Sequence, residues 1–174
     1  MKSGYGLDVA TEIKQLEVIK QLKEKYARYI DIVPTFMGAH AFPKEYKGGR
    51  EDEYVKLICE EMIPKVAEKG LAEFCDVFCE QGYFSTQQAT LILTTAKKYK
   101  MKARIHADEF IDSGAAAVAA KVGALSADHL MAVSDEGIQK LISKNVIATV
   151  LPGTTVYLGK YTFAPLRKFI DSGL

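Results

Sequence analysis

Hydrophobic residues along the chain alternate between short, nearly continuous runs and longer stretches in which they recur once per helical turn. The continuous runs indicate strands and the periodic stretches indicate helices, because the two structures expose side chains with different periods. The predicted strands cover residues 31–36, 74–79, 103–107, 126–130 and 146–151. The predicted helices cover residues 8–27, 50–69, 86–99, 112–122, 134–143 and 165–171. Apolar strands separated by helices are typical of a parallel sheet covered on both faces.

Two architectures fit this alternation, a (β/α) barrel and an open, doubly wound sheet. Residues 2–6 look like the end of one further strand before the first helix. A full barrel needs roughly 200 to 250 residues, and the 174 residues here fall about two strands short of that. The open sheet is the weaker alternative, because no G-x-G-x-x-G motif follows a strand. We therefore predict an α/β fold, a partial TIM-like (β/α) barrel in which residues 1–174 form a single partial domain.

Composition and charge exclude several classes of partner. The chain is 48% hydrophobic, which is enough to form a substantial core. It has 23 basic and 22 acidic residues, so it lacks the basic excess that nucleic-acid and membrane-surface binding usually need. No apolar run approaches the roughly 18 residues that span a bilayer, and the first residues do not resemble a secretory signal. We expect a cytoplasmic protein that binds neither nucleic acid nor membrane.

The chain has three cysteines, Cys59, Cys75 and Cys79, which could be free thiols or metal ligands. An odd number of scattered cysteines favours a reducing compartment. Cys75 and Cys79 lie in a predicted strand, whereas zinc-binding cysteines are usually two residues apart on a turn. We therefore expect these two residues to be buried core thiols.

All three histidines fall at the carboxyl end of a predicted strand. They are His40, His106 and His129, and in a parallel barrel that end forms the catalytic face. Glu80 follows another predicted strand, and Tyr5 follows the strand remnant at the start of the chain. A single histidine at such a position is equally well explained as a hydrogen-bonded residue at a strand end. Three at the same end of different strands indicate a functional site.

The segment His106-Ala107-Asp108-Glu109 carries the most specific chemistry. A neutral imidazole is a good ligand for a divalent metal such as zinc. A carboxylate three residues later can reach a metal-bound water and exchange a proton with it. Asp108 is better explained as a cap of the next helix. The pattern therefore predicts His106 as a metal ligand and Glu109 as an acid and base.

Six segments of the chain together resemble imidazolonepropionase, a family of the amidohydrolase superfamily. Their order and spacing match over nearly the whole length, and the set is specific although each segment alone is weak. They are KSGYGLD (2–8), TFMGAHA (35–41), CDVFCE (75–80), RIHADEF (104–110), SADHL (126–130) and LPG (151–153).

The resemblance implies a reaction, a cofactor and an assembly. The family hydrolyses the ring of a small molecule, 4-imidazolone-5-propanoate, to N-formimidoyl-L-glutamate in histidine degradation. It uses one divalent metal, zinc or iron, in a TIM-like barrel of the metal-dependent hydrolase type. The full-length enzyme is expected to be a homodimer.

The resemblance also implies a role for five residues of this chain. His106 would bind the metal, and Glu109 would act as general base and acid and contact the substrate. His129 would orient the attacking water or polarise the scissile carbonyl. Tyr5 and His40 would bind the substrate. No role is implied for Glu80.

Part of the implied metal site has no counterpart in the sequence. The family's His-x-His pair from the first strand and its aspartate from the eighth strand are absent, so His106 is the one implied ligand present. Tight zinc sites use three or four protein ligands, and we expect the 174-residue chain alone to be inactive. Two alternatives stay open: another amidohydrolase acting on a cyclic amide or amidine, including an aminohydrolase, and a non-catalytic fragment that complements a partner.

Overall fold

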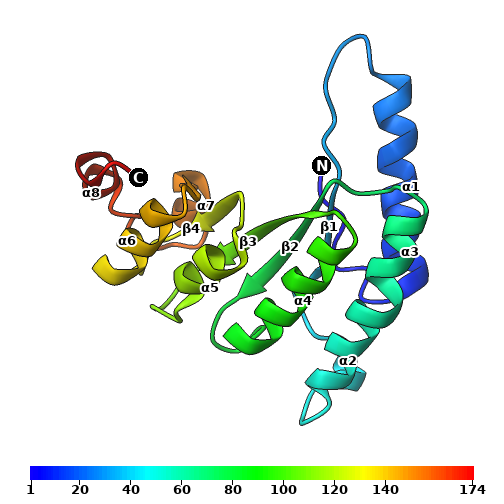
Figure 1. Ribbon diagram of the computed structural model, residues 1–174, viewed down its shortest axis with the longest axis horizontal. Coiled ribbons are helices and arrows are strands. Elements are labelled where there is room, and N and C mark those ends of the chain that lie inside the picture. The colour runs from blue at the N-terminus through cyan, green and yellow to red at the C-terminus, as the bar shows by residue number, and fades with distance from the viewer. The chain divides into compact units, whose positions relative to one another are not determined.

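The computed structural model describes residues 1–174, which contain one five-stranded sheet with helices between the strands (Figure 1). The strands follow one another in chain order, and every strand pairing whose register is defined is parallel. A doubly wound sheet reverses its order at a switch point, so the sequential order favours the predicted barrel-type topology and confirms the α/β class. The strands are β1 Thr35–Ala39, β2 Phe74–Cys79, β3 Lys102–Ala107, β4 Ser126–His129 and β5 Ile147–Thr149.

The helices occupy the stretches with helical periodicity, with one addition. Each predicted helix is present, and α7 was not predicted. The α-helices are α1 Val9–Lys25, α2 Glu51–Leu57, α3 Ile63–Glu68, α4 Thr86–Lys98, α5 Ala115–Val122, α6 Asp135–Ser143, α7 Pro152–Tyr157 and α8 Leu166–Ser172. A short 3₁₀ helix, η1, covers Lys44–Tyr46, and a π-helical turn, η2, covers Ile58–Met62. None of these helices is long and apolar enough to cross a lipid bilayer.

The residues divide into two compact units, each built from two stretches of chain. The first unit contains Met1–Val77 and Leu91–Lys102. The second contains Phe78–Thr90 and Ala103–Leu174.

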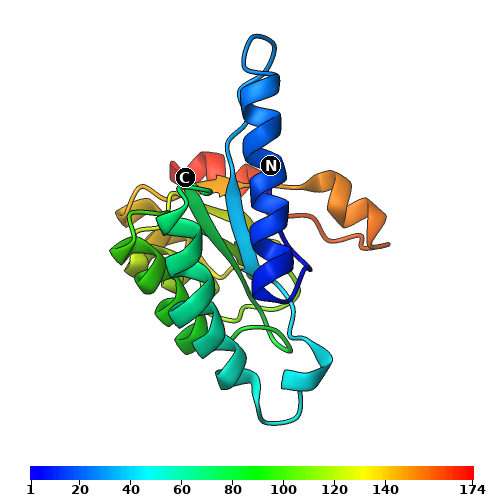
Figure 2. The same cartoon turned by 90° about the vertical axis from the view of Figure 1, so that its right-hand side faces the viewer.

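In the first unit, α1 packs against β1 (Figure 2). The Asp8 side chain caps α1 by accepting a hydrogen bond from the Thr11 amide. Leu16 and Ile19 are buried on one face of the helix. Before α1, Lys2 forms a parallel bridge with Thr35 of β1. The predicted strand remnant at residues 2–6 is therefore reduced to a single bridge.

The predicted helix at residues 50–69 contains a π-helical turn at its centre. The chain runs from α2 through η2 into α3 without leaving a helical path. Pro64 lies at the start of α3 and has no amide hydrogen to donate to the carbonyl four residues earlier. A π turn just before this proline lets the helix continue while that bond is missing. Ile58 and Met62 of the turn are buried.

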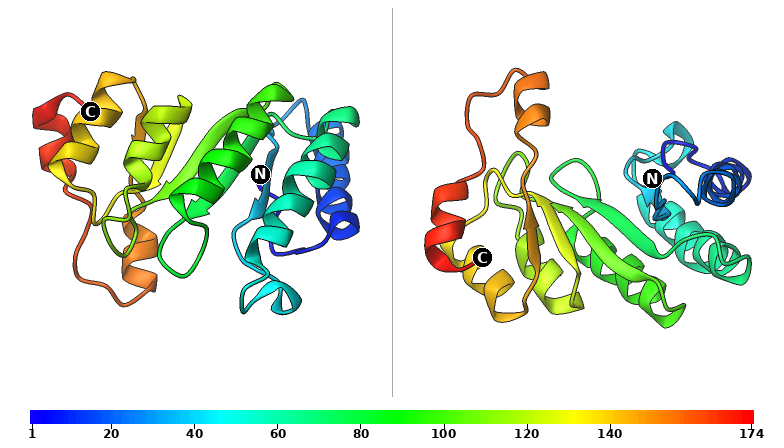
Figure 3. Two further views of the ribbon diagram at one scale, coloured as in Figure 1. Left: turned by 60° about the horizontal axis from the view of Figure 1, so that its bottom comes forward. Right: turned by 90° about the horizontal axis from the view of Figure 1, so that it is seen from above.

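In the second unit, α5 and α6 pack side by side along β3 and β4 (Figure 3). Helix α5 begins at Ala115, three residues later than predicted, because Gly114 before it has the left-handed φ of +79°. Strand β5 is shorter than predicted and ends at Thr149. The Pro152-Gly153 pair starts helix α7, because proline is favoured at the first helical position.

The cysteines are free thiols with different environments. Cys75 and Cys79 are buried in β2, as expected for core thiols, and Cys59 on the π turn is half-buried. Burial raises the pKa of the Cys75 thiol. Burial, with the negative charges of Asp108 and Glu80, raises the pKa of Cys79 to about 12.

Alkylation should therefore distinguish the three thiols. At pH 8 the folded chain is expected to react with iodoacetamide first at Cys59. Burial raises the pKa of all three thiols, but Cys59 is half-buried, whereas Cys75 and Cys79 are buried and form the reactive thiolate least readily. Peptide mapping by mass spectrometry measures the order, and a denatured sample should label at all three positions. Labelling of Cys79 in the folded chain as fast as Cys59 would contradict this expectation.

Candidate active site

Five non-glycine residues in the segments singled out by the sequence have left-handed backbone conformations. They are Tyr5, Leu7, Asp108, His129 and Leu130, with φ angles of +58°, +60°, +49°, +75° and +55°. Side chains other than glycine seldom adopt this region, and it persists only where the surrounding structure holds it. Such residues cluster at functional sites. The strained backbone therefore lies in the segments for which the sequence indicated a functional site.

The second unit brings together His106, Glu109 and His129. Residues 106 and 129 lie on the neighbouring strands β3 and β4, whose register pairs Ala107 with His129. The two imidazole rings are 5.1 Å apart between centroids. Nδ1 of His129 is 3.5 Å from Oε1 of Glu109, and both side chains are buried. Three of the five predicted site residues thus form one cluster at the carboxyl ends of two strands.

The Glu109 carboxyl has a perturbed acidity. Burial raises its pKa, and the negative charge of Glu80 raises it further, whereas His106 lowers it. A carboxyl group whose pKa is raised towards neutrality is better suited to exchange protons during a reaction. The neighbouring imidazoles supply groups that can donate or accept hydrogen bonds. The cluster can therefore hold and transfer a proton.

Glu80, to which sequence reasoning assigned no role, supports the loop after β3. Its Oε2 atom accepts a hydrogen bond from the Phe110 amide at 2.9 Å, and its Oε1 atom accepts one from the Gln81 amide at 2.9 Å. Glu80 is buried. It fixes the chain immediately after Glu109, and its negative charge helps to raise the pKa of that carboxyl.

Asp108 caps helix α5, as predicted. Its carboxylate accepts hydrogen bonds from the amides of Ser113, Ala115 and Ala116 and from the Ser113 hydroxyl, at 3.0 to 3.1 Å. Burial raises the pKa of this carboxyl, and the four donors oppose the rise. The residue before Glu109 is thus tied to a helix, which limits the movement of Glu109.

A cavity of about 240 Å³ opens beside Glu109 in the second unit. It has an acidic group in Glu109, a basic group in Lys160 and an aromatic ring in Phe110. Pockets for small molecules combine apolar walls with a few polar groups that orient the ligand. The lining residues are Glu109, Phe110, Met131, Ala132, Lys160, Tyr161 and Thr162.

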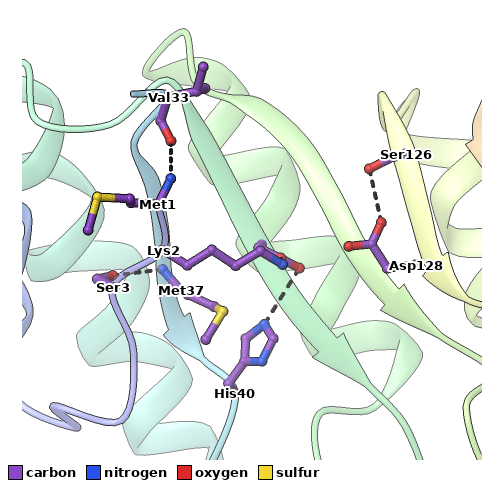
Figure 4. A network of polar contacts seen from close by, with 9 residues as sticks. Met1, Lys2, Ser3, Val33, Met37, His40, Ser126 and Asp128 are labelled. Atoms are coloured by element: carbon purple, nitrogen blue, oxygen red, sulfur yellow. Dashed lines mark hydrogen bonds and ion pairs between the residues drawn. The ribbon is translucent and has the colours of Figure 1, made fainter. Parts of the chain in front are cut away.

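In the first unit the structure brings together Tyr5 and His40. Their rings are 6.4 Å apart and nearly perpendicular. His40 directly follows β1 and is buried. Its Nε2 atom is 3.5 Å from Oδ1 of Asp76, and Lys2 Nζ donates a hydrogen bond to Oδ2 of Asp76 at 2.8 Å (Figure 4). Asp76 therefore connects the predicted substrate-binding histidine to a lysine near the start of the chain.

Asp76 and Lys2 were not predicted as members of the site. Asp76 is completely buried in β2, between apolar neighbours. A buried carboxylate must be paired with a cation or with hydrogen-bond donors. The single acidic residue inside an otherwise apolar strand was the available signal. Its partners lie far away in the sequence, so the pairing itself could not be predicted.

Replacing Asp76 with asparagine is expected to destabilise the chain by about 2 kcal/mol, because it removes the buried charge that Lys2 and His40 face. Lys2 is partly exposed and can turn towards water, which limits the loss. Urea unfolding measures the change, and Asp31→Asn at an exposed position of the same unit is the control. Equal stability of both variants would show that the Asp76 charge contributes nothing.

Comparison with known proteins identifies relatives of this chain. No family model matches the chain. Imidazolonepropionase of Clostridium tetani is 54% identical over 172 residues, which are 99% of this chain and 40% of that protein. Imidazolonepropionase of Streptococcus gordonii is 50% identical over 173 residues, which are 99% of this chain and 55% of that protein. The chain thus spans about two-fifths to just over half the length of these relatives.

Among solved structures, a Xaa-Pro dipeptidase resembles the chain with a TM-score of 0.54 at 14% identity, over 91% of this chain and 45% of that one. A likeness at this identity bears on the fold alone, and it supports the α/β architecture. The resemblance that the six sequence segments indicated is confirmed: nearly the whole chain matches a segment of imidazolonepropionase at about half identity.

Proposed function

We propose that this chain provides the central catalytic segment of an imidazolonepropionase, which hydrolyses 4-imidazolone-5-propanoate to N-formimidoyl-L-glutamate in histidine degradation. The observation that carries the proposal is the cluster of His106, Glu109 and His129 in a chain that is 54% identical to such an enzyme over 172 residues. The free thiols fit a cytoplasmic location.

The reaction needs a proton to move from water to the leaving nitrogen. Water adds its oxygen to the ring carbonyl carbon, the carbon–nitrogen bond breaks, and the nitrogen leaves with a proton. Glu109 accepts a proton from the water and delivers it to the nitrogen, a transfer that its raised pKa favours. His129, close to Glu109, orients the water or donates a hydrogen bond to the carbonyl oxygen as charge develops on it.

The resemblance assigns substrate binding to Tyr5, His40 and Glu109. In the second unit, Glu109 lines the cavity described above and can accept a hydrogen bond from the ring. In the first unit, Tyr5 exposes its phenol and His40 holds an imidazole against Asp76. These groups supply hydrogen bonds that can recognise a polar heterocycle.

The donor groups of the second unit suit a divalent metal. His106 offers an imidazole, with a second imidazole and a carboxylate close by, and such nitrogen and oxygen donors fit zinc or iron. His106 would hold the ion. When bound, such an ion would lower the pKa of a coordinated water to about 7, which would make hydroxide available at neutral pH.

A chimera tests the proposal. The matching segment of the Clostridium tetani protein is replaced by these 174 residues, and loss of substrate absorbance and formation of N-formimidoyl-L-glutamate are measured. We expect turnover by the chimera and none by the 174-residue chain alone, which has one implied metal ligand. Size-exclusion chromatography of the chimera tests the proposed homodimer.

The other outcomes discriminate between the alternatives. A folded, metal-loaded chimera that leaves this substrate intact but releases ammonia from a cyclic amidine would favour an aminohydrolase. A folded chimera without hydrolytic activity would favour a non-catalytic role. The unmodified Clostridium tetani protein, assayed beside the chimera, controls for the preparation and the metal.

A further inference from the structure

The loop that carries Tyr5 is held by two side chains of helix α1. The Gly4 amide donates a hydrogen bond to Oε1 of Gln15 at 2.8 Å, and Nε2 of Gln15 donates one back to the Gly4 carbonyl at 3.3 Å. The Gly6 amide donates a hydrogen bond to Oε1 of Glu12 at 2.9 Å. The peptide groups on both sides of Tyr5 are thus bound to the same helix.

This loop needs such support because its backbone is strained. Tyr5 and Leu7 have φ angles of +58° and +60°, and Gly4 has +136°. A non-glycine residue in this region is unfavourable and persists only when its surroundings hold it. The Tyr5 side chain is 65% exposed, so burial of its ring does not anchor the loop. The anchoring groups are those on α1.

Glu12 occupies a position where an apolar side chain would be expected. It lies one helical turn before Leu16, on the face that also buries Ile19, and it is completely buried. Its Oε2 atom is buried without a hydrogen-bond partner. Burying a carboxylate with one unsatisfied oxygen is unfavourable. Stability alone would favour leucine or methionine here, so the acid is explained by what it binds, the Gly6 amide.

The fit between Glu12 and Gly6 is close. A Cβ atom at Gly6 would lie 3.1 Å from Oε1 of Glu12 and 2.9 Å from the Thr11 side chain. Any side chain at this position would push the loop away from the helix. Glycine at residue 6 and glutamate at residue 12 therefore form a matched pair.

We propose that Glu12, together with Gln15, is a positioning residue that fixes the backbone at Tyr5 and so directs the Tyr5 phenol towards its ligand. The inference rests on the proposed function, in which Tyr5 contacts the substrate. Neither Glu12 nor Gln15 touches the substrate. Their effect should appear in binding, with proton transfer by Glu109 unchanged.

Hydrogen–deuterium exchange of the 174-residue chain tests the contact without any assay of activity. In Glu12→Met the Gly6 amide should exchange about tenfold faster or more, because the variant has no acceptor for it. Glu12→Gln should stay close to the parent, because its amide oxygen can still accept the bond. Glu24→Met, at an exposed position of the same helix, is the matched control and should change nothing.

Two results of the exchange experiment would overturn the proposal: Gly6 protection unaffected by Glu12→Met, or protection lost equally in the control. If Glu12→Met does not fold, Gln15→Ala replaces it, with faster exchange expected at Gly4 and little change at Gly6. Unchanged exchange at Gly4 in that variant would contradict the proposal that Gln15 and Glu12 hold the loop.

Kinetics of the chimera then test the link to Tyr5. Glu12→Met should raise KM about tenfold and leave kcat within about twofold, with Glu12→Gln restoring most of the loss. A normal KM despite rapid Gly6 exchange would show that the hydrogen bond between Gly6 and Glu12 does not position Tyr5. An inactive unmodified chimera would contradict the proposed function, and the exchange data would still decide whether Glu12 holds the loop.

Discussion

Replacing Asp108 with alanine should lower the free energy of unfolding by about 4 kcal/mol, the largest loss of stability expected for one substitution in the candidate site. The carboxylate accepts four hydrogen bonds, three of them from backbone amides near the start of α5. Ala115 and Ala116 are buried, so water cannot replace the lost acceptor for their amides. Urea unfolding followed by far-ultraviolet circular dichroism measures the change.

Two further variants complete this experiment. Asp108→Asn keeps one acceptor oxygen but places an amide against a backbone donor, so it should lose an intermediate amount of stability. Asp112→Ala, in the same loop but exposed, accepts one long bond of 3.4 Å and should cost less than about 0.5 kcal/mol. A loss below about 1 kcal/mol for Asp108→Ala would contradict the interpretation of this residue as the main cap of α5.

Replacing Glu109 with glutamine should lower kcat of the chimera by roughly 10² to 10⁴-fold, the range expected when a general acid and base is removed. Glutamine has the shape of glutamate and keeps an oxygen that can face His129, so the fold and the cavity should persist. It cannot accept a proton from water. Steady-state kinetics measure kcat, and the circular dichroism spectrum checks the fold.

The control for this variant is Glu136→Gln, the same chemical change at an exposed position of α6, where the carboxylate pairs with Lys140. It should leave kcat within about twofold of the parent, because surface ion pairs contribute little. A Glu109→Gln enzyme with a normal kcat would assign proton transfer to another group, and His129 would then be the next residue to replace.

Most strands could be predicted from the sequence because their signal is local, although the first prediction, residues 31–36, overlaps β1 only at Thr35 and Phe36. The run at residues 74–79 is bounded by polar residues, and β2 has the same limits. The last strand was predicted too long, since Val150 and Leu151 are apolar but lead into α7. The π turn was not predicted, because helical periodicity alone does not show how the chain accommodates Pro64.

The candidate site could be predicted as far as topology determines it. Parallel strands place their carboxyl ends at one edge of a sheet, so His106 and His129 were expected to be neighbours, and their rings are 5.1 Å apart. The supporting contacts depend on the tertiary fold. Lys2 and Asp76 are 74 residues apart in the sequence, and the bond from the Phe110 amide to Glu80 spans 30 residues. A local sequence pattern cannot predict contacts between residues that are this far apart in the chain.

The division of the chain into two compact units limits how this protein can be recombined. Each unit takes its residues from two separate stretches, and the boundaries fall after Val77, Thr90 and Lys102. No single breakpoint in the gene between residues 77 and 102 can therefore keep both units intact. Exchange between related genes at one point in this region would join half of a unit to a foreign half, whose core packing evolved separately.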